Sequence, residues 1–194
     1  MSSRPVRVAG LLLAAGAGRR MGGPKALVVG DDGVAWALSA SRALRTGGCE
    51  PVVVVVGAEA DRVRGLLAAE PVQVVEAADW DEGMGASLRT GLSHLLASGL
   101  DVEAALVHLV DLPDVGAEVI ARVVRQASPE VLARATYGDD GSNGHPVLLG
   151  SDHWAGVVAT ATGDRGARDY LRGREVLEID CADLARGGDV DRLP

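Results

Sequence analysis

Aromatic residues are scarce in this chain of 194 residues. Phenylalanine is absent, and Phe, Trp and Tyr together make up only 3% of the composition. A core without large rings has to be built of Val, Leu and Ala, which belong to the 47% of residues that are hydrophobic. The shortage also argues against a nucleic-acid surface on which bases stack against aromatic side chains.

Cysteine and long apolar runs are scarce as well. The two cysteines, Cys49 and Cys181, lie far apart and in no metal-ligand spacing, which argues against a disulfide framework or a structural zinc site. No apolar run approaches the length that spans a bilayer, and the N-terminal sequence carries no signal-peptide pattern. We therefore expect a cytoplasmic protein with no membrane partner.

Positive charge is in deficit. Lys and Arg number 19 against 27 Asp and Glu, and the net charge of -8 argues against nucleic acid as a partner. An acidic protein that handles an anionic ligand needs local cations or a divalent metal ion. The charged fraction of 24% is ordinary for a folded protein, and the length suits a single domain over residues 1–194.

Short apolar runs alternate with stretches of helical periodicity. Val52–Val56 is five valines in succession, as expected for a central strand buried on both faces. Further strands are predicted at 8–15, 72–75, 104–110, 131–136 and 176–179, and helices around 34–46, 63–67, 88–96 and 119–124. The alternation predicts an α/β fold with a mostly parallel sheet covered on both sides.

The loop after the first predicted strand combines glycines with cations. Its glycines are Gly16, Gly18, Gly22 and Gly23, and its cationic residues are Arg19, Arg20 and Lys25. Open α/β sheets bind ligands at the carboxyl edge of their strands. Glycines let the backbone come close to a polyphosphate and point N–H groups at its oxygens. The loop therefore predicts a cradle for a nucleoside triphosphate.

Two other interpretations of the loop stay open. One is a plain strand-to-helix turn, and the other is a dinucleotide fingerprint in which Glu59 serves as the ribose acid. The glycine spacing is G-x-G-x-x-x-G, which differs from the usual G-x-G-x-x-G fingerprint. Gly23-Pro24 also blocks a helix from starting inside the glycines.

A carboxylate follows the apolar run 104–110 directly. Asp111 is expected at the sheet edge beside the cradle, where a carboxylate suits Mg²⁺ that completes its shell with phosphate oxygens and water. Asp114 suits a turn or a helix N-cap better. His108, within the run, is expected to be a core histidine with its hydrogen bonds satisfied.

Two further glycine-containing stretches precede predicted helices. Gly83 and Gly85 come before the helix of Leu88, whose free N–H groups suit an anion or a base, although a capped surface helix fits equally well. The turn 163–168 carries two arginines that suit a phosphate. Salt bridges from these arginines to neighbouring aspartates are the alternative.

The whole loop string resembles the signature of nucleotidyltransferases related to molybdenum cofactor biosynthesis, the MobA-like family. The resemblance implies a Rossmann-like, three-layer α/β/α nucleotidyltransferase fold in which this loop holds the triphosphate. The positions carried over are Leu13, Ala14, Ala15, Gly16, Ala17, Gly18, Arg20, Met21, Gly22 and Lys25. Gly18 departs from the family, since many relatives have serine there.

Other stretches carry the same resemblance. Trp80, Gly83, Met84, Ser87, Leu88 and Gly91 match a segment that lies against the base and ribose in relatives. Asp111 matches a metal-binding aspartate, and Asp191 matches in part an aspartate that supplies a second metal ligand. Ala77 stands where relatives often have asparagine, and Arg192-Leu193 replaces their Thr-Pro.

The acceptor side is implied by two matches. His145 and Pro146 correspond to a stretch near the acceptor, for which a hairpin turn is the alternative. Arg165, Gly166 and Arg168 match a motif more typical of molybdopterin cytidylyltransferases than of the guanylyl enzymes. The Ala14-Ala15-Gly16 stretch also resembles the cytidylyl branch.

The resemblance implies transfer of CMP from CTP, with GTP as the second choice, to a molybdopterin-type acceptor with release of pyrophosphate. Arg20 and Lys25 would neutralise phosphate charge, Asp111 and Asp191 would hold Mg²⁺, and a molybdoenzyme or its maturation chaperone is an implied partner. Two alternatives remain. One is a cytidylyltransferase for a sugar or polyol phosphate, including methylerythritol phosphate, although Ala26 replaces the glutamine usual there. The other is a non-catalytic nucleotide or pterin carrier.

Overall fold

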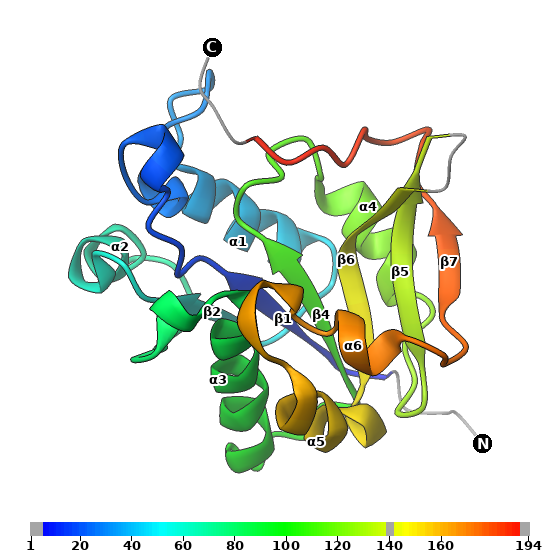
Figure 1. The fold of residues 1–194 in the computed structure, drawn as a ribbon. Coiled ribbons are helices and arrows are strands. Elements are labelled where there is room, and N and C mark those ends of the chain that lie inside the picture. Colours follow the sequence, from blue (N-terminus) through cyan, green and yellow to red (C-terminus); the bar gives the residue numbers. More distant parts are fainter. Residues whose placement is uncertain (1–5, 139–141, 191–194) are drawn as a thin grey trace.

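A seven-stranded sheet organises the protein in the computed structural model, which describes residues 6–138 and 142–190 (Figure 1). The strands are β1 (Val8–Leu13), β2 (Val52–Val56), β3 (Gln73–Glu76), β4 (Ala104–Leu109), β5 (Leu132–Tyr137), β6 (Ser142–Gly150) and β7 (Leu177–Asp180). Their order is β3-β2-β1-β4-β6-β5-β7. Only β6 runs antiparallel, to both β4 and β5, so the sheet is mostly parallel, as predicted.

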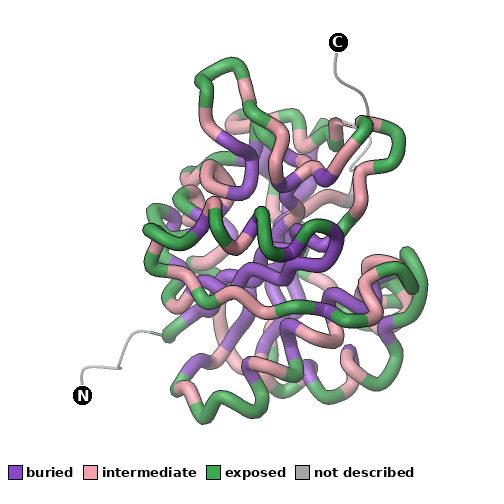
Figure 2. Tube along the Cα trace, turned by 90° about the vertical axis from the view of Figure 1, so that its left-hand side faces the viewer, coloured by how far each residue is buried: buried purple, intermediate pink, exposed green. Residues whose placement is uncertain are grey.

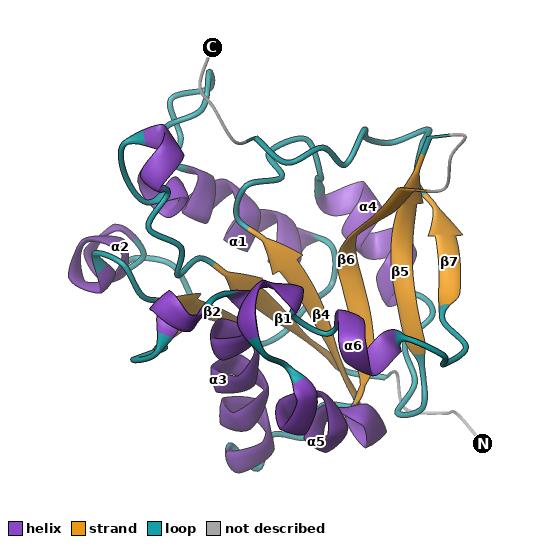
Figure 3. Ribbon diagram, viewed as in Figure 1, coloured by secondary structure: helices purple, strands orange, loops and turns teal. Residues whose placement is uncertain are grey.

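Helices cover both faces of the sheet (Figure 3). They are α1 (Trp36–Thr46), α2 (Ala60–Leu66), α3 (Met84–Ala97), α4 (Ala117–Val124), α5 (Ser151–Thr160) and α6 (Arg168–Leu171). Four short 3-10 turns are η1 (Arg19–Met21), η2 (Lys25–Leu27), η3 (Trp80–Glu82) and η4 (Gly163–Arg165). Buried residues of α1, α2 and α4 share one core layer, and those of α3 and α5 share the other. The three-layer α/β/α arrangement is confirmed.

The valine run of β2 shows how the sheet separates the two core layers. Val52, Val54 and Val56 belong to the layer of α1, α2 and α4. Val53 and Val55 face α3 on the other side. All five are at most 1% exposed, so the unbroken apolar run follows from burial on both faces. The buried parts of the chain gather in the middle of the molecule (Figure 2).

The strand at the β3 edge begins later than the apolar run suggests. The run predicts residues 72–75, whereas β3 spans Gln73–Glu76. Gln73 and Glu76 are exposed, because this strand pairs only with β2 and its outer edge meets solvent. Polar residues suit such an edge, since an apolar one invites pairing with another chain.

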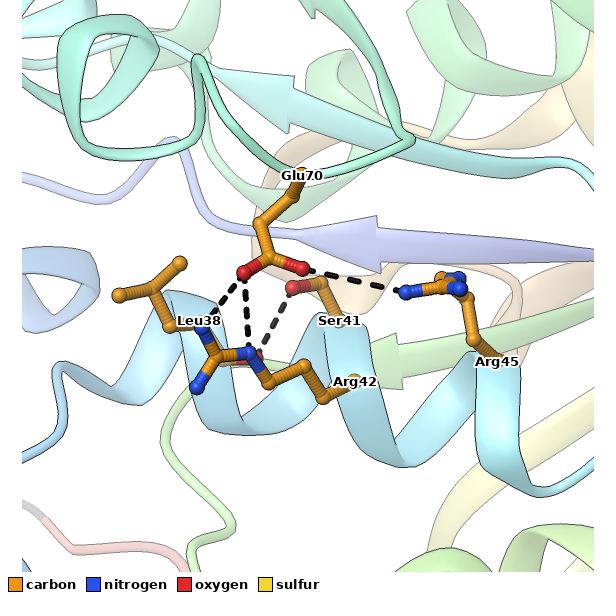
Figure 4. A network of polar contacts seen from close by, with 5 residues as sticks. All are labelled: Leu38, Ser41, Arg42, Arg45 and Glu70. Atoms are coloured by element: carbon orange, nitrogen blue, oxygen red, sulfur yellow. Dashed lines mark hydrogen bonds and ion pairs between the residues drawn. The ribbon is translucent and has the colours of Figure 1, made fainter.

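An ion-pair network fixes α1 to the segment that precedes β3 (Figure 4). Arg42 donates from Nε and Nη2 to Glu70 Oε1, at 2.9 and 2.6 Å, and Arg45 lies 3.9 Å from Glu70 Oε2. The hydrogen bond and charge of Glu70 raise the pKa of Arg42. This network lies away from the carboxyl ends of the strands and is structural. In the part of the chain that the structure describes, no helix is both long and apolar enough to cross a membrane.

Candidate functional site

The glycine loop follows β1, and its first backbone N–H groups are available to bind a ligand. Within the described residues, the N–H groups of Gly16, Ala17 and Gly18 make no hydrogen bond. Ala14 and Ala15 are still tied to the sheet edge: Ala14 N–H donates to the Val55 carbonyl, and the Ala15 carbonyl accepts from Ala58. A run of N–H groups beyond a fixed strand end forms an anion-binding concavity.

Gly18 makes the turn that closes this loop. Its φ is +56°, and a Cβ at this position would lie 1.9 Å from the Gly23 carbonyl oxygen. The backbone of Gly23 lies close to Gly18 because the Gly23 N–H donates a hydrogen bond to the Gly18 carbonyl at 3.3 Å. The loop of this chain therefore requires glycine at position 18.

Lys25 and Asp111 meet at the mouth of the loop. Lys25 Nζ lies 2.8 Å from Asp111 Oδ2, and the side chains are 17% and 18% exposed. The pair forms because β1 and β4 are neighbouring parallel strands, so the segments that follow them emerge side by side. Lys25 is the single lysine of the chain.

A cleft of about 360 Å³ lies between this pair and α3. We call it the loop cleft. It is lined by Leu13, Ala15, Gly16, Ala17, Gly18, Arg19, Lys25, Trp80, Asp81, Gly83, Met84, Ser87, Leu109, Val110, Asp111 and Asp164. Four predicted residues lie outside this lining: Ala14, Arg20, Met21 and Gly22. Ala14 is buried and Met21 packs against the core, whereas Arg20 is exposed and Arg19 lines the cleft.

The opposite wall of the cleft is held by an arginine that the sequence analysis did not single out. Arg89 of α3 donates to the Ala161 carbonyl at 2.9 Å and to the carboxylates of Asp79 and Glu82, at 2.7 and 3.0 Å. It thereby joins α3 to the end of α5 and to the turn that carries Trp80. Gly85 permits the close packing, since a Cβ there would lie 2.7 Å from Thr162 N.

A second cavity, of about 710 Å³, adjoins the loop cleft and shares Met84, Leu109 and Asp164 with it. We call it the arginine cavity. Four residues predicted on the acceptor side line it: His145, Arg165, Gly166 and Arg168. Pro146 is buried beside them and is not part of the lining. Five charged lining residues were not predicted: Arg134, Asp164, Arg172, Arg174 and Glu178.

His145 lies in the arginine cavity as a neutral ring at pH 7. Its Nδ1 lies 3.4 Å from the Val107 carbonyl oxygen, and its own carbonyl accepts from the Tyr137 hydroxyl at 2.7 Å. Burial lowers the pKa of the His145 imidazole. His145 sits on strand β6, which pairs antiparallel with β5.

His108 differs from expectation. It is fully buried in β4, but neither ring nitrogen has a hydrogen-bond partner within the described residues. Burial and the nearby His145 lower its pKa to about 3. The prediction of a satisfied core histidine was therefore wrong about the hydrogen bonds, because the apolar residues around this strand offer no acceptor.

The C-terminal segment reaches the site from the far edge of the sheet. Asp114 accepts from the N–H groups of Arg186 and Gly187, at 2.8 and 3.1 Å. Val190 N–H then donates to the Asp111 carbonyl at 3.0 Å, so the red segment in Figure 1 crosses the end of β4. Asp191, expected as a second metal ligand, lies outside the described residues.

The dinucleotide interpretation finds little support in this geometry. Glu59, the candidate ribose acid, has a φ of +52° and forms an ion pair with Arg62 on the surface. It does not line the loop cleft. The glycine loop continues into η1 and η2, and the first α-helix begins only at Trp36. A dinucleotide fingerprint needs a helix N-terminus at the glycines.

Solved structures with this fold include nucleotidyltransferases. A nucleotidyl transferase from Methanothermobacter thermautotroptrophicus superposes with a TM-score of 0.81 at 20% identity, covering 96% of this chain and 92% of that one. A manganese complex of Rv0371C from Mycobacterium tuberculosis H37Rv gives 0.75 at 23%, covering 95% and 94%. The inositol-1-phosphate CTP transferase from T. maritima gives 0.70 at 17%, covering 97% and 91%. At these identities the likeness shows the fold.

Sequence comparison identifies the family. A curated relative, the nicotine blue oxidoreductase of Paenarthrobacter nicotinovorans, is 37% identical over 194 residues, covering 96% of this chain and 93% of that protein. The sequence profile of the family described as the MobA-like NTP transferase domain matches residues 10–179. With the loop, the fold and this match in agreement, the chain belongs to the MobA-like nucleotidyltransferase family.

Proposed function

We propose that the protein transfers a nucleoside monophosphate from a nucleoside triphosphate to a phosphorylated acceptor and releases pyrophosphate. The observation that carries the proposal is the Lys25–Asp111 pair, which lines the loop cleft together with the open N–H groups of the glycine loop, in a cleft that shares a wall with the arginine cavity. One cavity suits the triphosphate and the other suits the acceptor. Transfer requires these two ligands to meet at a shared wall.

The reaction exchanges one phosphorus–oxygen bond for another. An acceptor phosphate oxygen forms a bond to the α-phosphorus while the bond from that phosphorus to the bridging oxygen of pyrophosphate breaks. The acceptor phosphate is already ionised near neutral pH, so no general base is required. The work of the protein is positioning and neutralisation of charge spread over several oxygens.

The residues of the loop cleft divide this work. The N–H groups of residues 16–18 bind β- and γ-phosphate oxygens, and Arg19 and Arg20 supply positive charge at the cleft and at the surface beside it. Lys25 leaves Asp111 when the triphosphate enters and neutralises charge on the leaving pyrophosphate. Trp80 and Ser87 lie on the wall that receives the base and ribose.

Asp111 is the residue that fits a magnesium ion. Mg²⁺ binds one or two carboxylates and completes its shell with phosphate oxygens and water. Within residues 6–138 and 142–190 there is no group of three or more His, Cys, Asp or Glu able to hold a metal ion. The protein therefore offers a partial donor set that needs substrate oxygens. When bound, the ion would supply Lewis-acid stabilisation of the phosphate charge, with Asp191 as a further candidate ligand.

CTP is our first choice of donor and a molybdopterin-type phosphate our first choice of acceptor. The support is the Ala14-Ala15-Gly16 stretch and the turn of Arg165 and Arg168, which resemble the molybdopterin cytidylyltransferases. A sugar or polyol phosphate is the alternative acceptor, since the inositol-1-phosphate CTP transferase shares the fold.

A product screen tests the proposal. Each nucleoside triphosphate is paired with molybdopterin and with sugar and polyol phosphates in the presence of Mg²⁺, and products are identified by mass spectrometry alongside pyrophosphate release. A new phosphoanhydride product with stoichiometric pyrophosphate supports transfer. Binding of triphosphate without pyrophosphate from any pair would show a nucleotide carrier instead.

A second candidate function is reduction of a dye-like organic acceptor. The observation that favours it is the 37% identity, along the whole chain, to a protein named nicotine blue oxidoreductase. In such a reaction a reduced nicotinamide dinucleotide would give up a hydride, and the acceptor would take it with a proton. Oxidation of the dinucleotide that depends on both protein and dye, measured by absorbance, would favour this candidate over transfer.

A further inference from the structure

The arginine cavity concentrates positive charge in an acidic protein. Five arginines line it together with only two carboxylates, so three positive charges remain in a molecule of net charge -8. The arginines are Arg134, Arg165, Arg168, Arg172 and Arg174. Such an excess is repulsive unless an anion occupies the cavity. Asp169, which pairs with Arg165 and Arg172 outside the lining, offsets one of these charges.

The floor of the cavity is one row of the sheet. Val107 of β4 pairs with Val147 of β6, Val147 pairs with Arg134 of β5, and Arg134 pairs with Glu178 of β7. Residues paired across strands point to the same face, so the row passes from apolar side chains to a charged pair. Because neighbouring strands are about 4.8 Å apart, Arg134 lies about 10 Å from β4, the strand that leads to Asp111.

Arg134 has binding capacity that the protein does not use. Its Nε is buried and has no hydrogen-bond partner within the described residues, while its Nη2 pairs with Glu178. The side chain is 22% exposed. Buried donors are almost always satisfied in native proteins, so the unpartnered Nε shows that the protein does not use all the donors of Arg134, a side chain that lines the cavity.

The arginines at the other end of the cavity differ in the ion pairs that they form within the protein. Arg165 and Arg172 both pair with Asp169, at 3.2 and 3.1 Å. The guanidinium of Arg168 makes no hydrogen bond or ion pair in the described part of the chain. Its uncommitted guanidinium suits a phosphate close to the wall shared with the loop cleft.

We propose that the acceptor carries two separate anionic groups joined by an apolar or flat body, one held at Arg168 and the other at Arg134. The phosphate that attacks lies at Arg168, the body covers Val107 and Val147, and the second anion lies at Arg134. The inference deepens the proposed function and rests on its assignment of the arginine cavity to the acceptor. It names the acceptor class as a phosphate with a distant carboxylate, phosphate or thiolate.

Titration calorimetry with α,ω-alkane bisphosphonates of increasing chain length, in the absence of nucleotide, tests the proposal. The matched probes are alkyl monophosphonates of the same lengths. We expect affinity to pass through a maximum at one chain length, where the bisphosphonate reaches both Arg168 and Arg134, at roughly tenfold or more above the monophosphonate. Equal affinity of the two probes at every length would overturn the inference.

Two variants test the role of Arg134. Arg134→Met should abolish the advantage of the second phosphonate and leave monophosphonate binding unchanged. Glu178→Gln should raise bisphosphonate affinity severalfold, because it releases Arg134 from its ion pair. Arg62→Met, on the surface of α2, is the matched control. A bisphosphonate advantage that persists in Arg134→Met, or one that falls in Glu178→Gln, would contradict the assignment.

These measurements separate the inference from the proposed function. If the bisphosphonate series behaves as expected but no triphosphate yields pyrophosphate, the two-anion cavity stands and nucleotidyl transfer falls. If transfer is observed, and acceptors that lack the second anion react with the same kcat/KM as those that carry it, the inference alone falls.

Discussion

The absence of a side chain at Gly18 allows the tight turn of the glycine loop. Gly18→Ala would either stay in the left-handed region, at a cost of about 1–2 kcal/mol, and displace the Gly23 carbonyl, or leave that region and reshape the loop. We expect triphosphate affinity to fall roughly tenfold or more, with little change in melting temperature. Calorimetric titration measures the affinity. Gly23→Ala is the control, since a Cβ there meets nothing within 4 Å and should leave binding intact.

Lys25 is expected to act on the transition state more than on binding. Lys25→Met removes the cation beside Asp111 and should lower kcat roughly 10²- to 10³-fold in the transfer assay, with KM for the triphosphate raised far less. Lys25→Arg restores the charge and should recover part of the loss. A Lys25→Met protein that turns over at a normal rate would remove this residue from the mechanism.

His108 should make the protein sensitive to acid. Its pKa is about 3 in the folded protein against an ordinary 6.5, so between these values the unfolded chain binds a proton that the folded one does not. Stability is fully present above pH 6.5 and falls as the pH drops toward 3, by about 2 kcal/mol at pH 5. Urea unfolding from pH 7 to 5 measures the slope.

His108→Leu provides the comparison for this slope. The variant should unfold with a flatter pH dependence, because the buried imidazole that must stay neutral is gone. His145 contributes in the same direction, because burial lowers its pKa too. A slope unchanged in His108→Leu would assign the acid sensitivity to other groups.

At the scale of elements, Arg89 couples three segments that build one wall of the loop cleft. Arg89→Met should loosen the turn of Trp80 from α3 and lower kcat/KM for the triphosphate roughly tenfold to hundredfold, with KM for the acceptor nearly unchanged. Steady-state kinetics with each substrate varied in turn checks this. An equal effect on both substrates would indicate a general loss of structure.

Most elements could be predicted because their signals are local. The boundaries of β2 match the valine run, and α1 ends at Gly47 as its glycine pair suggests. The insertion of β6 between β4 and β5 was not predictable, because pairing between strands distant in sequence leaves no periodic trace. The same limit applies to β3, whose edge position explains its polar ends.

The candidate site was predictable to the extent that motifs report it. Lys25 and Asp111 come together as the two strand ends suggest. Arg134 and Arg89 escaped notice because their importance comes from contacts across strands and helices. One signal was available for Arg134: a charged residue within a short apolar strand run. The choice between Arg19 and Arg20 at the cleft depends on the turn at Gly18, which the sequence does not reveal.

At the scale of the whole molecule, the separation of charge should govern how ligands are recruited. The arginine cavity attracts anions that the rest of the acidic surface repels. Raising NaCl to several times physiological strength should therefore weaken bisphosphonate binding severalfold. A titration series in NaCl measures this effect. Arg62→Met, a substitution on the surface of α2 away from the arginine cavity, should leave the salt dependence of binding unchanged.

The chain has one lysine, and its side chain lies in the loop cleft. In this chain a reagent that acylates amines can therefore react at Lys25 in the loop cleft, besides the N-terminal amine. Coupling to a sensor chip or dye through amines would abolish triphosphate binding in the molecules that react at Lys25. A bound triphosphate would protect the Lys25 ε-amine during labelling. Immobilisation for affinity measurements should therefore use another chemistry. The fraction of Lys25 that a bound triphosphate protects from acylation measures how much of the protein has the ligand bound.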